Sequence, residues 1–212
     1  KITKETKDNW IRDYERKVKG ISKRFPKAEM VICFRRHDSL LDSLYKQYVL
    51  EGGTGNIRAL FSLKPNKGLI GKKDLEFKKR VEIIEKEHKK EPYVMIYSDI
   101  KKDYKKCIKS MLSYFGVPTD GVEESEFKKE HESKGRKRYE LIKILNKAKI
   151  KRGLIGRIAR SNRVDGLKYK LLKYPLVDME RKISIGQKMR KKVMEEYKSD
   201  WEGVKRYSER QK

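Results

Sequence analysis

The stretch AEMVICFRRHDSLLDSLYKQYVL, residues 28–50, contains the two kinds of element from which the rest of the fold can be predicted. Its first seven residues are nearly all apolar, which is typical of a buried strand in a parallel sheet. Arg35 and Arg36 follow this run, and then apolar residues recur at helical spacing. The stretch therefore predicts a strand, a short basic turn and an amphipathic helix over residues 38–50, which Gly52 and Gly53 would end.

Helix and strand patterns alternate on both sides of this stretch, with a loop expected over residues 54–72. Apolar residues with helical spacing predict five further helices, and PYVMIYSDI predicts a second buried strand. Strands that alternate with helices indicate an α/β fold with a central parallel sheet, here mostly helical with few strands. The helices are expected at residues 8–24, 73–90, 103–115, 138–150 and 186–207, and the second strand at Pro92–Ile100.

The charge of the chain is strongly positive and unevenly distributed. The net charge is +26 over 212 residues, of which 42% are charged and 36% hydrophobic. Residues 1–126 carry 29 basic and 20 acidic side chains, whereas residues 127–212 carry 28 and 11. A positive field of this size attracts polyanions, so nucleic acid, an acidic glycan, an anionic membrane and a phosphorylated cofactor all stay open as partners.

Several classes of protein are disfavoured by what the sequence lacks. No apolar run approaches the ~20 residues that span a bilayer, and KITKETKDNW at the start is not a signal peptide. The first residue is not methionine, so the gene product can begin elsewhere, and an upstream membrane anchor is an alternative to the expected cytoplasmic location. Cys33 and Cys107 form no disulfide framework and are expected to be buried as small apolar groups.

No metal site is expected from the histidines. His37, His88 and His131 are far apart in the sequence and have no neighbours with the spacing of metal ligands. His88 falls on the apolar face of the expected helix 73–90, with Phe77, Val81 and Ile84. It is therefore expected to be a helix-end side chain.

The basic turn of the opening stretch suggests a phosphate site. Ligands of parallel α/β sheets bind at the carboxyl ends of the strands, where Arg35 is expected and where the next helix begins. Ser43 follows Arg35 by eight residues, about one turn into that helix. Arginine binds phosphate with paired, charge-assisted hydrogen bonds, and a serine hydroxyl can add another. The alternative is that Arg35 pairs with a carboxylate such as Asp38 and that Ser43 is an ordinary helix residue.

A second candidate for phosphate binding is ESKGRKR, residues 132–138. Gly135 permits a tight turn with exposed backbone N–H groups, and Lys134 and Arg136 flank it with positive charge. Such a loop can wrap a phosphate, although a solvated basic loop is the alternative reading.

Together these segments resemble the PAPS-dependent sulfotransferases, in particular the bacterial-like, carbohydrate- and glycosaminoglycan-modifying branch. KAEMVICFRRHDSLLDSLYKQYVLEGG looks like the family's strand, turn and helix that bind the 3′-phosphate of the donor. YVMIYSDIKKDYKKCIKSMLSYFGVP looks like the next strand and helix, with Ser98 where an acidic residue usually stands, and ESKGRKR resembles the loop that closes over the nucleotide. The similarity covers residues 27–147 and extends more weakly to residue 207.

This resemblance implies a function, a fold and a set of site residues. The reaction would be transfer of a sulfuryl group from PAPS to a hydroxyl or amine of a carbohydrate-type, anionic acceptor, without a metal. The fold would be a three-layer, P-loop-like single domain over 1–212, with a strand and helix core in 1–126 and a basic loop and C-terminal helices in 127–212. The residues implied in donor binding are Arg35, Ser43, Lys134, Gly135 and Arg136.

The sequence departs from the family in one important segment. The loop of type P-K-x-G-T-[ST], which grips the 5′-phosphosulfate, is absent, and neither GLIGKKD nor KRGLIGR replaces it. We therefore expect the chain to correspond to the C-terminal two-thirds of a sulfotransferase. The general base stays unassigned, since His37 would lie beside the 3′-phosphate and away from the sulfuryl group.

Two alternatives to a sulfotransferase remain, and the oligomeric state is open. One is a basic nucleic-acid-binding protein that uses interleaved aromatic residues such as Tyr169, Tyr174 and Tyr207. The other is a degenerate sulfotransferase-like scaffold.

Overall fold

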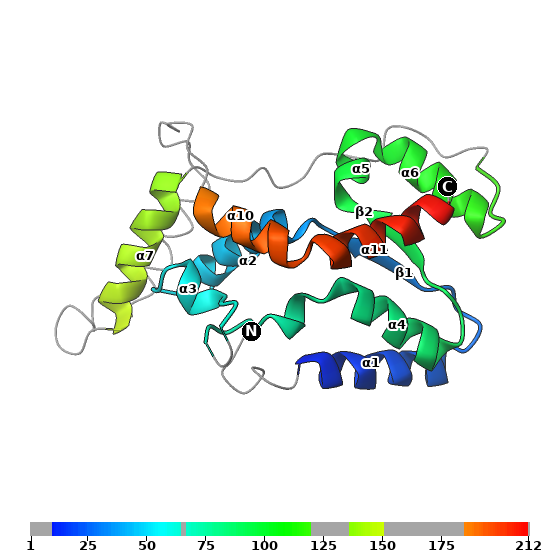
Figure 1. Cartoon of the computed structure of the whole chain (residues 1–212), viewed down its shortest axis with the longest axis horizontal. Coiled ribbons are helices and arrows are strands. Elements are labelled where there is room, and N and C mark those ends of the chain that lie inside the picture. Colours follow the sequence, from blue (N-terminus) through cyan, green and yellow to red (C-terminus); the bar gives the residue numbers. More distant parts are fainter. Residues whose placement is uncertain (1–9, 65–66, 120–135, 151–184, 212) are drawn as a thin grey trace.

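A short parallel sheet of two strands, β1 (Val31–Phe34) and β2 (Tyr93–Ile96), lies among the helices of this chain (Figure 1). The computed structural model describes residues 10–64, 67–119, 136–150 and 185–211. Val31 is opposite Tyr93 and Phe34 is opposite Ile96. The predicted α/β class with a parallel sheet is thus confirmed, in a chain that is mostly helical.

Helices make up most of the described chain. Helices α1 (Trp10–Arg24) and α4 (Phe77–His88) pack together on one side of the sheet, and α11 (Lys198–Arg210) crosses the sheet (Figure 1). Their bounds are α1 Trp10–Arg24, α2 His37–Leu50, α3 Ile57–Leu60, the 3₁₀ turn η2 Lys73–Leu75, α4 Phe77–His88, α5 Tyr97–Lys102, α6 Tyr104–Tyr114, α7 Arg136–Ile150, α10 Gln187–Glu196 and α11 Lys198–Arg210.

Helices pack against both faces of β2, because alternate residues of a strand point to opposite faces. On one face Tyr93 contacts α6, where its hydroxyl donates to Ser110 Oγ at 3.0 Å and its ring lies 4.9 Å from that of Tyr114. On the other face Val94 and Ile96 belong to a cluster that includes residues of α4 and α11. Burial of apolar side chains there holds the strands and helices together.

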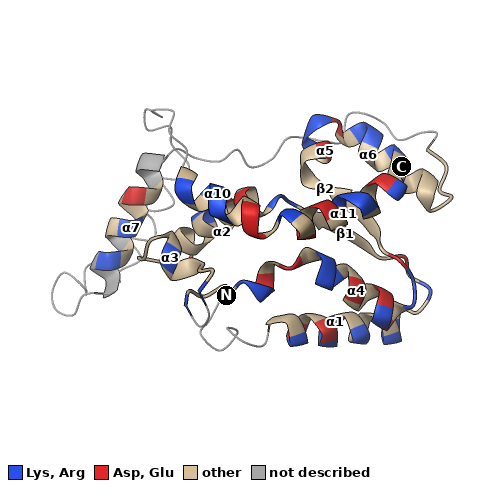
Figure 2. Ribbon diagram, viewed as in Figure 1, with Lys and Arg blue, Asp and Glu red and all other residues tan. Residues whose placement is uncertain are grey.

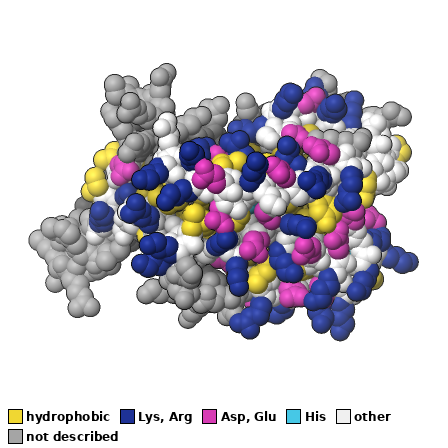
Figure 3. All heavy atoms as spheres, viewed as in Figure 1, with side chains coloured by type: hydrophobic (Ala, Val, Ile, Leu, Met, Phe, Trp, Pro, Cys, Tyr) yellow, Lys and Arg dark blue, Asp and Glu magenta, His cyan; other side chains and the backbone are white. Residues whose placement is uncertain are grey.

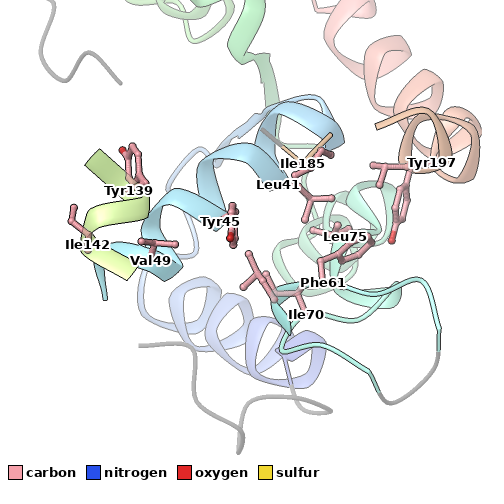
Figure 4. Close-up of a cluster of buried hydrophobic side chains, with 12 residues drawn as sticks. Leu41, Tyr45, Val49, Phe61, Ile70, Leu75, Tyr139, Ile142, Ile185 and Tyr197 are labelled. Atoms are coloured by element: carbon pink, nitrogen blue, oxygen red, sulfur yellow. The ribbon is translucent and has the colours of Figure 1, made fainter. Parts of the chain in front are cut away.

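A second and larger cluster surrounds α2 (Figure 4). Leu41 and Tyr45 of α2 are buried in it, as the apolar spacing of this helix predicts, and Val49 is buried as well. Other members come from α7, from Ile185, from Tyr197 and from the segment 54–72. That segment is therefore more than a connecting loop: it contains α3, and Phe61 pairs with Ile70 in an isolated bridge.

The end of α2 follows the sequence closely. Gly52 has φ of 107°, a left-handed conformation that a side chain rarely adopts. A Cβ atom at Gly53 would collide with the ring of Tyr48. The pair of glycines thus allows the chain to turn away tightly at the end of the helix.

Three predicted boundaries are wrong. The second strand ends at Ile96, and residues expected in it up to Ile100 begin α5 instead, where Asp99 in the first turn favours a helix. The expected helix 73–90 is divided at Glu76 into η2 and α4. The expected helix 186–207 is divided at Tyr197, whose side chain is buried between α10 and α11.

The cysteines differ from expectation. Cys33 is exposed and Cys107 is half-buried, so the expectation that both are buried is wrong for Cys33. Val31, two residues earlier and hence on the same face of β1, is 45% exposed as well. The helices cover this face over β2 and leave it accessible over β1.

Two searches of the described residues give negative results. None of the described helices combines the length and apolar character needed to cross a membrane. Among the same residues, no group of three or more His, Cys, Asp or Glu side chains is arranged to hold a metal ion.

Candidate functional site

A pocket of about 430 Å³ opens at the carboxyl ends of both strands. Arg35 and Arg36 follow β1, Tyr97 and Ser98 follow β2, and all four residues line the pocket. The far side is formed by α11. This is the place where parallel α/β sheets bind ligands, and it is where the sequence placed the basic turn.

Positive charge exceeds negative charge in this pocket. The lining includes Lys101 and Lys205 in addition to the two arginines, against the carboxylates Asp99 and Glu209. Basic residues are frequent on α5 and α6, which follow β2 (Figure 2). Elsewhere on the face shown in Figure 3, basic and acidic side chains are interspersed. The pocket combines this local excess of positive charge with a concave shape, which suits an anion.

Arg35 is held in the pocket by uncharged groups. Its Nε donates to Ser39 Oγ at 2.7 Å, and its guanidinium carbon lies 4.7 Å from the centroid of the Tyr97 ring. Among the ion pairs between described residues, none involves Arg35. A hydroxyl and an aromatic ring orient the guanidinium without neutralising it, so its charge remains available to a ligand.

Arg36 is held differently, by the side chain of Asp38. Its Nε and one terminal nitrogen donate to the two carboxylate oxygens at 2.7 and 2.9 Å. Arg190 of α10 donates to the same carboxylate at 2.5 Å and to Asp42 at 2.7 Å. Burial alone would raise the pKa of Asp38, but Arg36, the Ser39 N–H and Arg190 hold it below its usual value. The predicted alternative, a pairing of Asp38 with Arg35, does not occur; the neighbouring arginine takes that place.

His37 is buried and is not among the residues that line the pocket, whereas the resemblance implies a place beside the 3′-phosphate. Its ring stacks between Phe77 and Tyr197, with centroids 4.0 and 4.4 Å away. Its Nε2 lies 3.1 Å from an oxygen of Asp200 and 3.0 Å from the carbonyl oxygen of Leu75. Both neighbours are acceptors, so Nε2 carries the proton. The same Asp200 oxygen accepts the Phe77 N–H and the other oxygen accepts the Lys78 N–H, both at the start of α4. His37 is therefore a packing and bridging residue.

His88 is confirmed as a helix-end side chain. It is the last residue of α4 and is buried. Its Nδ1 lies 3.1 Å from Ser22 Oγ and its Nε2 lies 2.6 Å from the carbonyl oxygen of Ala28. It thereby ties α4 to α1 and to the chain that leads into β1.

The two serines at the start of α2 have different positions. Ser39 lines the pocket and accepts from Arg35, whereas Ser43 is half-buried and is not among the residues that line it. Residues four apart lie on the same face of a helix, so Ser43 is one turn further along the face that carries Ser39. The structure therefore brings Arg35 together with Ser39, and it places Ser43 behind that pair.

The basic loop can be located only through the helix that follows it. Lys134 and Gly135 lie outside the described residues, and Arg136 is the first residue of α7, its side chain not described. Lys143 approaches the ring of Tyr45, and Asn146 donates to the carbonyl oxygen of Val49 at 2.8 Å. Lys143 precedes Asn146 on α7 just as Tyr45 precedes Val49 on α2, so the two helices run in the same general direction. The N-terminus of α7 is therefore directed toward the N-terminal half of α2.

Sequence reasoning missed much of the lining of the pocket. Tyr97 was expected in a strand, and Lys101, Trp201 and Lys205 were not singled out, although all four line the pocket. Lys205 and Trp201 lie on α11, more than 160 residues after Arg35. Only Tyr97 carried a usable signal, since it directly follows the apolar run of β2.

Comparisons with known proteins do not assign this pocket. The chain matches no model of a protein family, no curated protein and no solved structure. The function is therefore argued from the pocket itself and from the resemblance of the sequence motifs.

Proposed function

We propose that this chain is a PAPS-dependent sulfotransferase domain and that the pocket at the carboxyl ends of the strands binds the 3′-phosphate side of the donor. The observation that carries the proposal is the state of Arg35. It lies directly after a parallel strand, and Ser39 and Tyr97 hold it without neutralising its charge. A phosphate suits such a guanidinium, because two charge-assisted hydrogen bonds can form at once.

The surroundings of Arg35 support a nucleotide rather than a bare anion. The aromatic rings of Tyr97 and Trp201 line the same pocket as Lys101 and Lys205. Aromatic rings stack on the base of a nucleotide, while cations bind the phosphate groups of the same nucleotide. The 3′-phosphate, ribose and base of one PAPS molecule need this combination in one place.

The proposal includes the finer fold and the remaining donor residues. The two-stranded sheet would belong to a three-layer, P-loop-like fold, and Lys134, Gly135 and Arg136 would close over the nucleotide from the N-terminus of α7. The direction of α7 supports this, since the N-terminal end of the helix is directed toward the N-terminal half of α2. Ser43 would join Arg35 at the phosphate once the bond from Arg35 to Ser39 is exchanged for the ligand.

The reaction would be an in-line transfer of the sulfuryl group. The bond between sulfur and the bridging oxygen of the phosphosulfate breaks, a bond from sulfur to the acceptor oxygen or nitrogen forms, and the acceptor loses a proton. Adenosine 3′,5′-bisphosphate leaves. The described residues contribute to this by positioning the donor and by balancing its negative charge. The acceptor proposed is an anionic, carbohydrate-type molecule, in keeping with the net charge of +26.

The first experiment is calorimetry with adenosine 3′,5′-bisphosphate. Arg35→Ala should weaken binding by about 1.5 kcal/mol or more, roughly tenfold, which is the scale of a charged hydrogen bond. Arg35→Lys should fall between wild type and Arg35→Ala, because it keeps the charge and loses the paired geometry. Arg16→Ala is the matched control, since Arg16 is an exposed arginine on α1. Unchanged affinity in Arg35→Ala, or no binding by wild type, contradicts the proposal.

A pair of serine variants assigns the hydroxyl. If Ser43 binds the phosphate, Ser43→Ala weakens binding of the bisphosphate. Ser39→Ala leaves the affinity unchanged or raises it, because Ser39 competes with the ligand for Arg35. The reverse result assigns the role to Ser39 and contradicts the part of the proposal that rests on the eight-residue spacing.

A salt titration separates nucleotide binding from nucleic-acid binding. Binding of a short RNA or DNA duplex that is tighter than the bisphosphate and falls steeply with salt would favour the basic nucleic-acid-binding alternative. Bisphosphate binding that is lost in Arg35→Ala while the duplex does not compete favours the sulfotransferase.

A further inference from the structure

The outer edge of β2, opposite β1, borders a groove of about 1030 Å³. Four consecutive strand residues, Tyr93–Ile96, line it, with α6 on one side and the end of α11 on the other. Consecutive residues of a strand point to opposite faces of the sheet. A groove that touches all four therefore lies against the edge of the strand, where backbone N–H and C=O groups project.

Backbone groups of β2 alternate between its two edges. The Tyr93 N–H donates toward β1, to the carbonyl oxygen of Met30 at 2.8 Å. The Val94 N–H points the other way and donates to Gln211 Oε1 at 2.8 Å. The side-chain nitrogen of Gln211 in turn donates to the carbonyl oxygen of Pro92 at 2.9 Å.

The amide of Gln211 thus makes the pair of bonds that one residue of a neighbouring parallel strand would make. Such a residue accepts from the N–H that follows its partner in β2 and donates to the C=O that precedes it. Within the part of the chain that the structure describes, no third strand lies on this edge. One side chain at the end of a helix takes the place of the first bonds of that strand.

We propose that this edge of β2 accepts an extended, acidic segment of a partner protein as a third strand, which displaces Gln211. Charge indicates the chemistry of the partner. Lys102, Lys106 and Lys109 line the groove from the α5 and α6 side. Asp99 and Asp103 line it too, but the Asp103 carboxylate already accepts the Lys106 N–H at the start of α6. The lysines attract an acidic segment, and the strand edge selects a polypeptide, because only a peptide offers N–H and C=O groups at strand spacing.

This surface is separate from the donor pocket in its chemistry. The donor pocket offers side-chain cations and rings to a phosphate, whereas the groove offers backbone bonds and a rim of lysines. The two share Ile96, Asp99 and Ser208. The inference goes beyond the proposed function, and it can hold or fail whether or not the donor pocket binds a nucleotide.

The test uses a fluorescein-labelled peptide, Glu-Val-Glu-Thr-Glu-Val-Glu-Thr with an amidated end, titrated with the full chain by fluorescence anisotropy. A matched peptide carries N-methyl groups on its two central residues, which keeps every charge and blocks backbone pairing on both edges. We expect the methylated peptide to bind at least tenfold more weakly. Equal binding of the two peptides, or no binding of the first at about 1 mM protein, overturns the proposal.

Variants of the chain give results of opposite sign. The Gln211→Ala variant should bind the acidic peptide about threefold more tightly, because the competing side-chain amide is gone. The double variant Lys106→Glu with Lys109→Glu should weaken it at least tenfold. Its matched control is Lys17→Glu with Lys19→Glu on the exposed side of α1, which should change little. Circular dichroism verifies that each variant is folded, and weaker binding by Gln211→Ala contradicts displacement.

A sulfated oligosaccharide distinguishes the other class of ligand. If it displaces the peptide and binds the Lys106 and Lys109 variant more weakly, while methylation of the peptide has no effect, the groove is a polyanion surface and strand addition is wrong. If methylation abolishes peptide binding and the oligosaccharide competes poorly, strand addition holds.

Discussion

Arg35 and the three residues after it are consecutive between β1 and the start of α2, yet they lie in two different environments. Arg35 faces the pocket and is held by a hydroxyl and a ring. Arg36 and Asp38 form a network with Arg190, and His37 is buried between two aromatic rings. In the first environment no carboxylate of the described residues pairs with Arg35. In the second, Arg36 and Arg190 balance the charge of Asp38, and the ring of His37 is buried.

The difference separates residues that stabilise the fold from the residue that we propose for ligand binding. Asp38 has no exposed side-chain surface, so its charge must be balanced by neighbours. Arg36 and Arg190 are its partners, which leaves Arg35 outside the network. Arg36 thus has a structural role, and Arg35 is the arginine for which we propose a ligand. The experiments that follow test this division, from the largest expected effect to the smallest.

His37→Ala should give the largest loss, about 3 kcal/mol in the free energy of unfolding. It removes a side chain that is 1% exposed from between Phe77 and Tyr197, and it takes one hydrogen-bond partner from Asp200. Urea denaturation measures the loss. Phe25→Ala is the control, because Phe25 is 55% exposed and should change stability little. A loss below about 1 kcal/mol in His37→Ala would mean that this side of the turn is not part of the core.

Asp38→Asn should cost about 2 kcal/mol. Breaking a buried ion pair costs about 3–5 kcal/mol, and the value here is smaller because Arg36 and Arg190 are 51% and 37% exposed. Asp13→Asn is the control: its pair with Arg16 is exposed and should contribute less than about 0.5 kcal/mol. Equal losses in the two variants would show that the Asp38 network is no more than a surface ion pair.

Acid should destabilise the protein in part through Asp200. Burial alone would raise the pKa of this carboxyl, but hydrogen bonds from His37 and from the N–H groups of Lys78 and Phe77 hold the pKa below its usual value. A folded pKa below the unfolded one gives stability that is present above about pH 4 and is lost as the pH falls through the folded value. Asp200→Asn should therefore lose less stability than wild type between about pH 5 and pH 3 in urea titrations. Equal losses would show that other carboxylates carry the acid response.

Arg35→Ala should have the smallest effect on folding, within about 0.5 kcal/mol, because its partners are a hydroxyl and a ring at the edge of a pocket. The same variant is expected to lose roughly tenfold in binding of the bisphosphate. Urea denaturation and calorimetry on one preparation measure both. A loss of stability above about 1 kcal/mol would place Arg35 with the structural residues and remove the contrast.

Much of the fold follows from local sequence patterns. The sequence predicted the bounds of β1 and α2 to within a few residues, and it predicted that glycines end α2. Such patterns can be recognised because the buried residues of a strand or of a helix recur at a regular spacing along the chain. They fail where the chain changes from one element to another, as at Tyr97, where a strand passes directly into α5.

By itself the sequence determined the two strands, the longer helices and the position of Arg35 at a strand end, whereas α3 and α5 were not predicted. Only the tertiary structure decided that Arg36 takes Asp38, that His37 meets Asp200 and that Ser39 holds Arg35. The far wall of the pocket and the Gln211 amide on the edge of β2 also come from α11 and the chain end beyond it. Periodicity reports which residues are buried but not which of two adjacent arginines pairs with a nearby side chain, and His37 and Asp200, 163 residues apart, meet only when the whole core is packed.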